Sequence, residues 1–279
     1  MTTTSTAAET TRQRSVVPGY LRPAPKAVLK IPAAGWTAAV IVLAVLVVEM
    51  YARSPLASPL DIVPVSDMAA TALQLMTDPD FLVDALGRTL GIIVVTFVLS
   101  SLLGIGAAYL LWRFDLWDRA FQPYLNVYYA VPTFALYPIM VVLFGSGIAP
   151  IAILSTIFAF GVVAMNARTG FNSVSPIVAK LGSTLRLTRW QYFRSILLPY
   201  ALPNIVTGLK LGLSYAIISV LASEFILSTQ GLGHYISIAY DSFDIAEMYA
   251  GILVVTALAL LATLGISAAL NRFDWRRRR

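Results

Sequence analysis

The sequence predicts an all-α membrane protein with six transmembrane helices and both chain termini in the cytoplasm. The first observation is composition: of the 279 residues, 58% are hydrophobic and 12% are charged, whereas soluble domains carry about 25% charged residues. The second is that the apolar residues form six stretches, each close to the roughly 20 residues that a helix needs to cross a bilayer. These stretches do not alternate with a period of two, so a membrane β-barrel is excluded.

The predicted elements follow one another along the chain. Residues 1–34 are rich in Thr, Pro and basic side chains, which indicates a disordered cytoplasmic tail. The six predicted spans are residues 35–52, 87–112, 124–145, 148–167, 200–227 and 249–271. An acidic extracellular or periplasmic loop over 53–84 separates the first span from a five-helix transmembrane domain over 85–271, and a basic tail over 272–279 follows.

The basic residues predict the orientation of these spans. All but three of the 20 Lys and Arg residues lie in the two tails, in the 2–3 loop or in the segment between spans 4 and 5. The loops on the opposite side are acidic, and basic loops stay in the cytoplasm, so both termini are predicted to be cytoplasmic. The net charge of +6 is therefore divided by membrane side and does not indicate nucleic-acid binding.

Several kinds of chemistry are excluded by the residues that are missing. The sequence has no cysteine, which excludes disulfides and thiol catalysis, and its one histidine, His234, argues against a histidine metal cluster. It has no Gly-rich phosphate-binding motif that ends in Gly-Lys, so any ATP must be bound by another subunit. No cofactor is expected on this chain.

The segment between spans 4 and 5 is too long for a simple tether and predicts two short amphipathic helices. Ser175-Pro176 is a plausible helix start, and Ile177, Leu181 and Leu185 follow at a spacing of four residues. Thr188 is a second start, followed by the apolar residues Trp190, Phe193 and Leu197. From this pattern alone, the pair could equally lie on anionic lipid or dock another protein.

At this segment the sequence resembles the permease subunits of bacterial ABC importers, in particular the nitrate/sulfonate/taurine branch. The matching pieces, in chain order, are Val131-Pro132 with Ala135-Leu136-Tyr137-Pro138, Phe144-Gly145-Ser146-Gly147, Asn166 with Gly170, Ile196-Leu197-Leu198-Pro199, and Ala222-Ser223-Glu224 with Gly231-Leu232-Gly233. The resemblance implies a type I ABC importer permease fold in the bacterial inner membrane, which forms the pathway for a small solute. It also implies a soluble ATPase that carries ATP and Mg, a second permease subunit and an extracytoplasmic solute-binding protein.

The resemblance implies that the two short helices, over about 175–198, couple the permease to the ATPase. The residues assigned to this role are Lys180, Leu181, Gly182, Leu185, Arg186, Arg189, Trp190, Phe193, Arg194 and Pro199. Trp190 and Phe193 would offer apolar area to a groove of the ATPase, and the alternative is that both pack under the bundle. Pro199, with Pro203, is expected to end the cytoplasmic helix where span 5 begins.

One departure from the family pattern bears on the partner subunit. The family's Glu-Ala-Ala falls here on Lys180-Leu181-Gly182, and its turn glycine falls on Arg186. A left-handed arginine costs about 1–2 kcal/mol, so either the turn has another shape or this subunit couples differently. A heterodimer with a different permease is therefore slightly favoured over a homodimer.

A second group of residues is predicted to line the pathway or its outer gate. The group consists of Tyr128, Pro132, Tyr137, Pro138, Glu224, Gly231 and Gly233. Glu224 is an ionisable residue near the outer end of span 5, and intramembrane ionisable residues are functional candidates by default. Glu49 is expected to reach the outer surface. Ordinary packing and interfacial belts are the simpler explanation for the tyrosines.

Two other kinds of membrane protein remain as alternatives. A secondary transporter would be driven by an ion gradient and would place ionisable groups at mid-depth, often within inverted repeats. A non-transporting scaffold would use its basic segment to bind lipid. The transported solute does not follow from the sequence.

Overall fold

The computed structural model describes residues 33–55, 57, 58, 62–128 and 133–271, and within these ranges every regular element is a helix. The elements are α1 (Ala33–Ala52), α2 (Val65–Leu75), η2 (Phe81–Gly87), α3 (Arg88–Arg113), α4 (Asp115–Tyr128), η3 (Thr133–Leu136), α5 (Tyr137–Phe144), α6 (Ile148–Phe171), α7 (Pro176–Thr184), α8 (Arg189–Tyr192), η4 (Phe193–Leu197), α9 (Leu198–Leu227), α10 (Leu232–Asp241) and α11 (Ile245–Asn271). The described residues divide into two units after Leu46, within α1. The account below concerns the second unit.

Five helical segments in the described chain are long and apolar enough to cross a membrane. They are Gly35–Ala52, Phe81–Arg113, Ile148–Phe171, Arg189–Leu227 and Ile245–Leu270. The predicted span over 124–145 is not among them. Its described parts are the end of α4, the 3-10 turn η3 and the eight-residue α5, and Pro132 lies outside the described residues.

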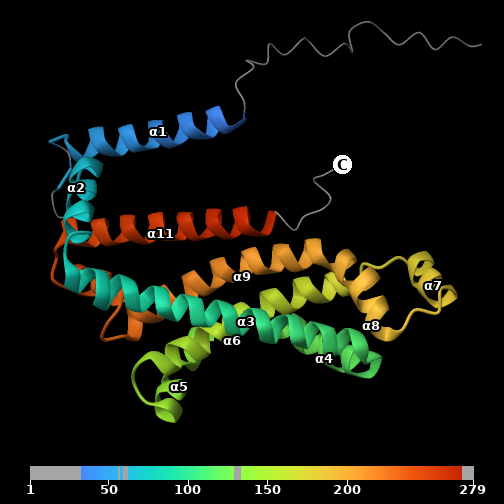
Figure 1. The fold of residues 1–279 in the computed structure, drawn as a ribbon. Helices are drawn as coiled ribbons and strands as arrows, with labels where there is room; N and C mark the ends of the chain where they lie inside the picture. Colours follow the sequence, from blue (N-terminus) through green and yellow to red (C-terminus); the bar gives the residue numbers. More distant parts are fainter. Residues whose placement is uncertain (1–32, 56, 59–61, 129–132, 272–279) are drawn as a thin grey trace, which may run out of the picture. The chain divides into compact units, whose positions relative to one another are not determined.

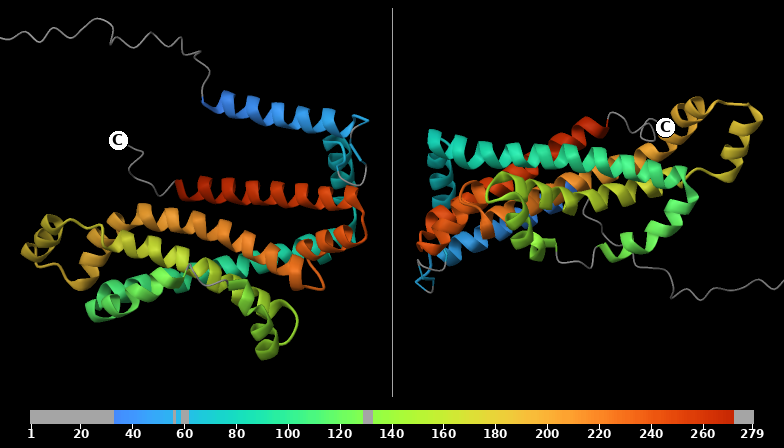
Figure 2. Two further views of the ribbon diagram at one scale, coloured as in Figure 1. Left: turned by 180° about the vertical axis from the view of Figure 1, so that it is seen from behind. Right: turned by 90° about the horizontal axis from the view of Figure 1, so that it is seen from below.

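The core of the second unit consists of α3, α6 and α9, with α6 packed against both of the others. Figure 1 shows these three helices side by side, and the views in Figure 2 agree. Val163 of α6 faces Gly104 of α3 and Gly212 of α9, where an added Cβ would come within 2.9 and 2.5 Å of its side chain. Small residues let membrane helices approach closely, since lipid offers no hydrophobic drive for helix association.

Two further apolar clusters close the ends of this core. One cluster joins α2, η2, α10 and α11 through residues such as Phe81, Leu232 and Val254. The other joins α3, α6, η4 and α9 around Phe171 and Leu197. The helix pair α7 and α8 lies at this second end of the unit and α2 at the first (Figure 1), so the predicted coupling residues lie at the opposite end from Gly231 and Gly233 of the second predicted group.

The predicted acidic loop over 53–84 differs from its expected form. It contains the helix α2 and the beginning of η2. The α2 segment buries Met68, Ala72 and Leu75 at a spacing of three to four residues, which is the period of one helix face. The length of this connection therefore reflects a packed helix rather than a free loop.

Candidate functional site

The helix pair between α6 and α9 starts where its capping residues predict. The Oγ of Ser175 accepts a hydrogen bond from the backbone N–H of Ile177 (3.2 Å) at the start of α7. Thr188 caps α8: its Oγ1 accepts from Gln191 N–H (3.3 Å), while Gln191 Oε1 accepts from Thr188 N–H (2.9 Å). These bonds satisfy backbone donors that a helix start leaves free. Both predicted helix starts are confirmed.

The outer face of this pair is an exposed apolar stripe. Ile177, Leu181 and Leu185 of α7 and its end are 79, 53 and 60% exposed, and Trp190 of α8 is 67% exposed. These four residues are called the apolar stripe below. An exposed apolar patch with basic neighbours is typical of a protein contact site.

The inner face of the pair is packed on the bundle. Gly182 lies so close to Tyr192 that an added Cβ would be 2.8 Å from the ring. The ring of Phe193 meets Tyr109 of α3 edge to face at 5.3 Å and stacks on Trp190 at 5.6 Å. Trp190 and Phe193 therefore differ: Phe193 packs on the bundle, while Trp190 faces outward.

The turn between α7 and α8 keeps the left-handed backbone that the family places on glycine. Arg186 has φ = +48°, and Leu187 N–H donates to the carbonyl of Gly182 (3.2 Å), five residues back, in the closing pattern of a Schellman motif. The expectation that an arginine here could require a turn of another shape is wrong. The arginine is held in a conformation that glycine adopts without strain.

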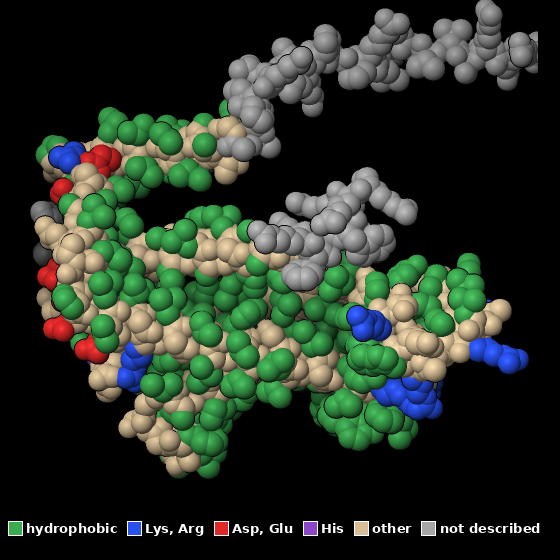
Figure 3. All heavy atoms as spheres, in the orientation of Figure 1, with side chains coloured by type: hydrophobic (Ala, Val, Ile, Leu, Met, Phe, Trp, Pro, Cys, Tyr) green, Lys and Arg blue, Asp and Glu red, His purple; other side chains and the backbone are tan. Residues whose placement is uncertain are grey.

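Basic side chains surround the apolar stripe. Lys180, Arg186, Arg189 and Arg194 are all exposed, and within the described part of the chain none of the three arginines forms a salt bridge. Figure 3 shows Lys and Arg side chains over the α4, α7 and α8 end of the molecule, whereas Asp and Glu gather over the α2 end. This end thus presents positive charge around an apolar surface.

Pro199 does not end the helix that carries Arg189, contrary to the prediction. Helical structure runs without interruption from Arg189 to Leu227, and the π-helical η4 immediately precedes Pro199. The N–H of Leu198 bonds to the carbonyl of Phe193, five residues back. The wider π turn lies where the proline ring would meet the carbonyl four residues back, and π turns are one way in which a helix accommodates such a residue.

The opposite end of α9 carries a buried carboxylate. Glu224 is fully buried, and Thr89 Oγ1 of α3 donates to its carboxylate at 2.7 Å. Gly233 N–H donates to the same carboxylate (3.0 Å), and Leu232 N–H donates to Thr89 Oγ1 (2.8 Å). Two of the free N–H groups that begin α10 are therefore bound by a carboxylate and a hydroxyl, the arrangement that a helix N-terminus favours. Leu232 and Gly233 are the first two residues of α10.

The two predicted glycines are required by close contact with the end of α9. Gly231 has φ = +104°, and an added Cβ would lie 2.5 Å from the carboxyl carbon of Glu224. An added Cβ on Gly233 would lie 2.5 Å from the carbonyl of Leu221. Arg88, next to Thr89, donates to the side chain of Gln230. Glu224, Thr89, Gly231 and Gly233 are called the outer cluster below.

Thr89 and Arg88 were not among the predicted site residues. The hydroxyl of Thr89 is separated from Glu224 by 135 residues of sequence. No local spacing connects the two, because the contact arises only when α3 packs on α9. Of this cluster, the sequence indicated Glu224 and the Gly231-Leu232-Gly233 motif.

The predicted tyrosines lie along the described parts of the third span. The ring of Tyr128 covers Gly161, near the middle of α6, where an added Cβ would be 2.3 Å away. Tyr137 is buried, and its hydroxyl donates to the carbonyl of Leu227 (3.0 Å), at the end of α9. Pro138 is exposed at the first turn of α5. The described parts of this predicted span thus contact the middle of α6 and the C-terminal end of α9.

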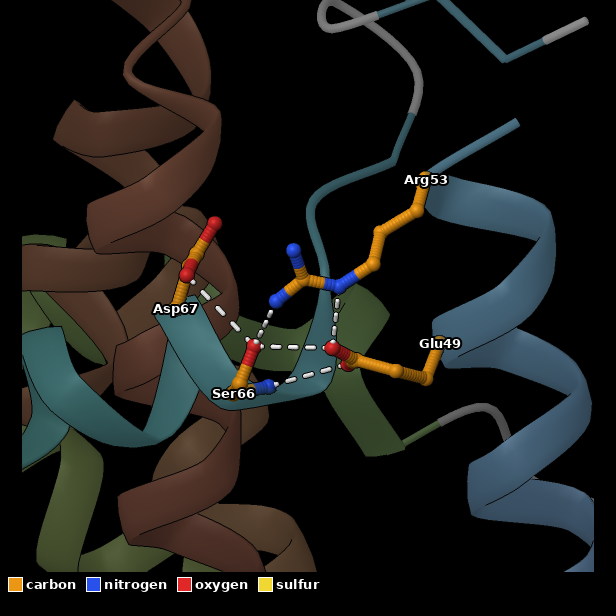
Figure 4. Close-up of polar contacts among 4 residues, drawn as sticks. All are labelled: Glu49, Arg53, Ser66 and Asp67. Carbon is orange, nitrogen blue, oxygen red and sulfur yellow. Dashed lines mark hydrogen bonds and ion pairs between the residues drawn. The ribbon is translucent and has the colours of Figure 1, made fainter. Parts of the chain in front are cut away.

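Glu49 forms a polar contact with the start of α2 (Figure 4). Its carboxylate pairs with Arg53 (2.7 Å) and accepts hydrogen bonds from the N–H and hydroxyl of Ser66 (3.1 and 2.9 Å). The contact links the last turn of α1 to the first turn of α2.

Within the described residues, no group of three or more His, Cys, Asp or Glu side chains is arranged to hold a metal ion.

Similarity to known proteins extends over most of this unit. Residues 100–279 match the family described as "Binding-protein-dependent transport system inner membrane component". The chain is 34% identical over 151 residues to the taurine transport system permease protein TauC of Escherichia coli (strain K12), covering 54% of this chain and 55% of that protein. It is 28% identical over 194 residues to the formylaminopyrimidine transport permease protein ThiX of Halalkalibacterium halodurans, covering 69% of this chain and 78% of that protein.

One further relative and one solved structure are also similar to the chain. The chain is 27% identical over 169 residues to the nitrate import permease protein NrtB of Leptolyngbya laminosa, covering 61% of each chain. An inward-facing structure of the MetNI methionine ABC transporter superposes with a TM-score of 0.60 at 17% identity, covering 68% of this chain and 94% of that chain. This superposition shows a shared fold.

Proposed function

Since this chain belongs to the family of binding-protein-dependent transport system inner membrane components, it is a membrane-embedded permease subunit without catalysis of its own, and we propose that it carries ATPase motion from the α7–α8 pair to the outer cluster. The prediction of an importer permease of the nitrate/sulfonate/taurine branch is confirmed by the family and by the taurine and nitrate relatives. The alternatives of a secondary transporter and a scaffold are set aside.

The observation that carries the proposal is the continuity of one helix between the two sites. Arg189 to Leu227 forms an uninterrupted helical segment of 39 residues. Its first residues include Trp190 of the apolar stripe, and its last turn includes Glu224 of the outer cluster. The π turn η4 joins α8 to α9 without a break in the helical hydrogen bonding, so we expect displacement at the stripe to be passed into α9, which ends at the cluster.

The apolar stripe is the proposed contact with the soluble ATPase, which would bind ATP and Mg. Its exposed side chains supply apolar area, and Lys180, Arg186, Arg189 and Arg194 supply a rim that sets register more than affinity. Gly182 and Phe193 hold the pair on the bundle, and Leu181, Leu185 and Trp190 make the contact. Pro199 begins the span above the π turn.

Substitution separates these two roles. In the permease–ATPase complex, Leu181→Ala with Trp190→Ala should abolish solute-stimulated ATP hydrolysis and leave membrane insertion unchanged, because both side chains are exposed. Phe193→Ala is the matched comparison, and we expect it to lower the melting temperature since its ring is packed. Unchanged stimulation in the Leu181/Trp190 variant would contradict ATPase docking.

We propose six spans with both termini in the cytoplasm of the bacterial inner membrane. The five apolar helices are joined by a third span whose described parts are the end of α4, η3 and α5. Its contacts support this assignment, since Tyr128 covers the middle of α6 and Tyr137 reaches the outer end of α9. Non-helical backbone at membrane depth is tolerated where protein or a water-filled pathway lies beside it, which supports a pathway role for Tyr128, Pro132, Tyr137 and Pro138.

The outer cluster is the proposed gate on the side that receives the solute. Glu224 holds the first turn of α10 against α3, so separation of α9 from α3 would release α10. The acidic side chains over the α2 end (Figure 3) offer a surface to the solute-binding protein.

A second permease subunit completes the proposed pathway, and we favour a different chain over a second copy. The departure at Lys180-Leu181-Gly182 supports this. The departure at Arg186 no longer does, because the arginine adopts the left-handed turn. Affinity purification from the native cells tests the point: a second, different membrane subunit is expected, and this chain alone would contradict the heterodimer.

For the solute, we propose a small anion or a small heterocyclic compound. The relatives are named for taurine, nitrate and formylaminopyrimidine, which are all small and polar. Mass spectrometry of the solute that copurifies with the binding protein would identify it, and a peptide or an oligosaccharide there would contradict the proposal.

A further inference from the structure

A cavity of about 470 Å³ lies between the end of α3 and the α7–α8 pair. It is lined by Tyr109, Trp112, Arg113, Ala179, Gly182, Leu187, Arg189, Tyr192 and Phe193. None of these residues belongs to the apolar stripe, which lies on the outer face of the pair. The cavity therefore needs its own explanation.

The walls of the cavity are aromatic and mutually packed. Trp112 and Tyr192 are nearly parallel, with an interplanar angle of 9° and centroids 6.5 Å apart. Tyr109 lies edge to face on Phe193 at 5.3 Å. Gly182 and Ala179 leave the α7 side without large side chains. The walls are thus rigid, and the space between them is not filled by the protein's own side chains.

Two arginines line the cavity, and the lining residues that the structure describes include no carboxylate. Arg113 ends α3 and lies over the ring of Phe114 at 5.4 Å, and Arg189 begins α8. In the described part of the chain, neither of them forms a salt bridge. Two cations beside aromatic walls favour a ligand with an anionic group, and guanidinium groups match phosphate oxygens in geometry.

The position of the cavity favours a lipid over a soluble anion. Tyr109 and Trp112 lie in the last two turns of α3, where aromatic residues mark the depth of lipid headgroups. The same helix exposes Leu102, Leu103 and Leu110, at 68, 55 and 49%, which gives acyl chains an apolar surface beside the cavity. In the proposed orientation this end faces the cytoplasmic leaflet, where anionic lipids are drawn to basic sites.

We propose that this cavity binds the headgroup phosphate of an anionic phospholipid, with Arg113 and Arg189 as its charge partners. The bound lipid would bridge α3 and the α7–α8 pair, and so would tie ATPase stimulation to the anionic lipid content of the membrane. The inference rests on the proposed orientation and coupling role of this end of the molecule.

The test uses the permease–ATPase complex in nanodiscs of phosphatidylcholine with phosphatidylglycerol. Native mass spectrometry counts the phosphatidylglycerol that stays bound after release from the nanodisc. Arg113→Gln with Arg189→Gln should lower retention by about fivefold for each arginine removed. Ala179→Phe keeps both charges but fills the space, and it should lower retention as well. Arg119→Gln removes an exposed arginine of α4 that does not line the cavity, and retention should not change.

Three other outcomes would each contradict the proposal and point to a different role for the cavity. Equal retention of phosphatidylcholine and phosphatidylglycerol would show an apolar cleft without an anion site. Displacement of the lipid by inorganic phosphate at millimolar concentration would identify a free anion as the ligand. If the double arginine variant retains its lipid but loses the ATPase subunit from the complex, the cavity is a contact site for that subunit. Lipid retention is measured without transport, so it can be interpreted even if the proposed function is contradicted.

Discussion

At the scale of single residues, Arg186 has the backbone of a glycine. Its φ of +48° closes α7 in the turn that the family assigns to glycine. Because a left-handed side chain costs about 1–2 kcal/mol, Arg186→Gly should raise the melting temperature of the purified permease. The matched control is Arg189→Gly, which places glycine in the right-handed first turn of α8 and should lower it. A fall in both variants would contradict the strain at Arg186.

The hydrogen bonds of Glu224 predict the effect of a second substitution. Its carboxylate accepts from Thr89 and from Gly233, so Glu224→Gln puts an amide donor where at least one acceptor is needed. We expect a loss of about 1–3 kcal/mol in the free energy of unfolding, measured by thermal denaturation in detergent, together with loss of transport.

Thr89→Val is the matched comparison for this prediction. It keeps the shape of the side chain and leaves Leu232 N–H without its acceptor, so the destabilisation should be of similar size. The double variant should lose less than the sum of the two, because both changes break one network. Additive losses would show that Thr89 and Glu224 act independently.

At the scale of elements, α4 is tied to α6 by one bidentate ion pair. Arg168 Nε and Nη2 donate to the two carboxylate oxygens of Asp118 at 2.5 and 2.7 Å. The hydrogen bond from Arg168 lowers the pKa of Asp118 below its ordinary value, and Asp118 precedes the predicted third span.

This pKa shift predicts an acid-sensitive contact. A carboxyl group with a lower pKa in the folded chain stabilises the fold at neutral pH, and this stability is lost as the pH falls through the folded-state pKa. Acidification should therefore raise the hydrogen exchange of α4, measured by mass spectrometry, in the wild-type chain. Asp118→Asn should exchange fast already at neutral pH and show no further change that depends on this pair. Identical pH profiles would contradict the role of the pair.

The helical elements also show what sequence reasoning can and cannot predict. The starts of α7 and α8 were predictable because Ser175 and Thr188 act on backbone groups within three residues. The run of helix through Pro199 was not, because a proline either ends a helix or is accommodated by a π turn, and the local sequence does not distinguish the two. The Thr89–Glu224 contact was not predictable either, since its partners meet only in the folded bundle.

At the scale of the whole molecule, the absence of cysteine allows a clean test of orientation. Asp80→Cys places a thiol at the α2 end and Lys180→Cys places one on α7, and both positions are exposed. In intact cells with a permeable outer layer, a membrane-impermeant maleimide should label Asp80→Cys and spare Lys180→Cys. Both should react after the membrane is opened, and the reverse pattern in intact cells would contradict cytoplasmic termini.

The long helix α9 has a geometric consequence. Its 30 residues extend about 45 Å at 1.5 Å per residue, so a tilt of about 10° around its middle would move each end by about 4 Å in opposite directions. A helix that pivots about its middle cannot move both of its ends in the same direction. If α9 moves in this way, one displacement closes the pathway at one membrane face and opens it at the other. This motion alone then prevents the pathway from being open at both faces together.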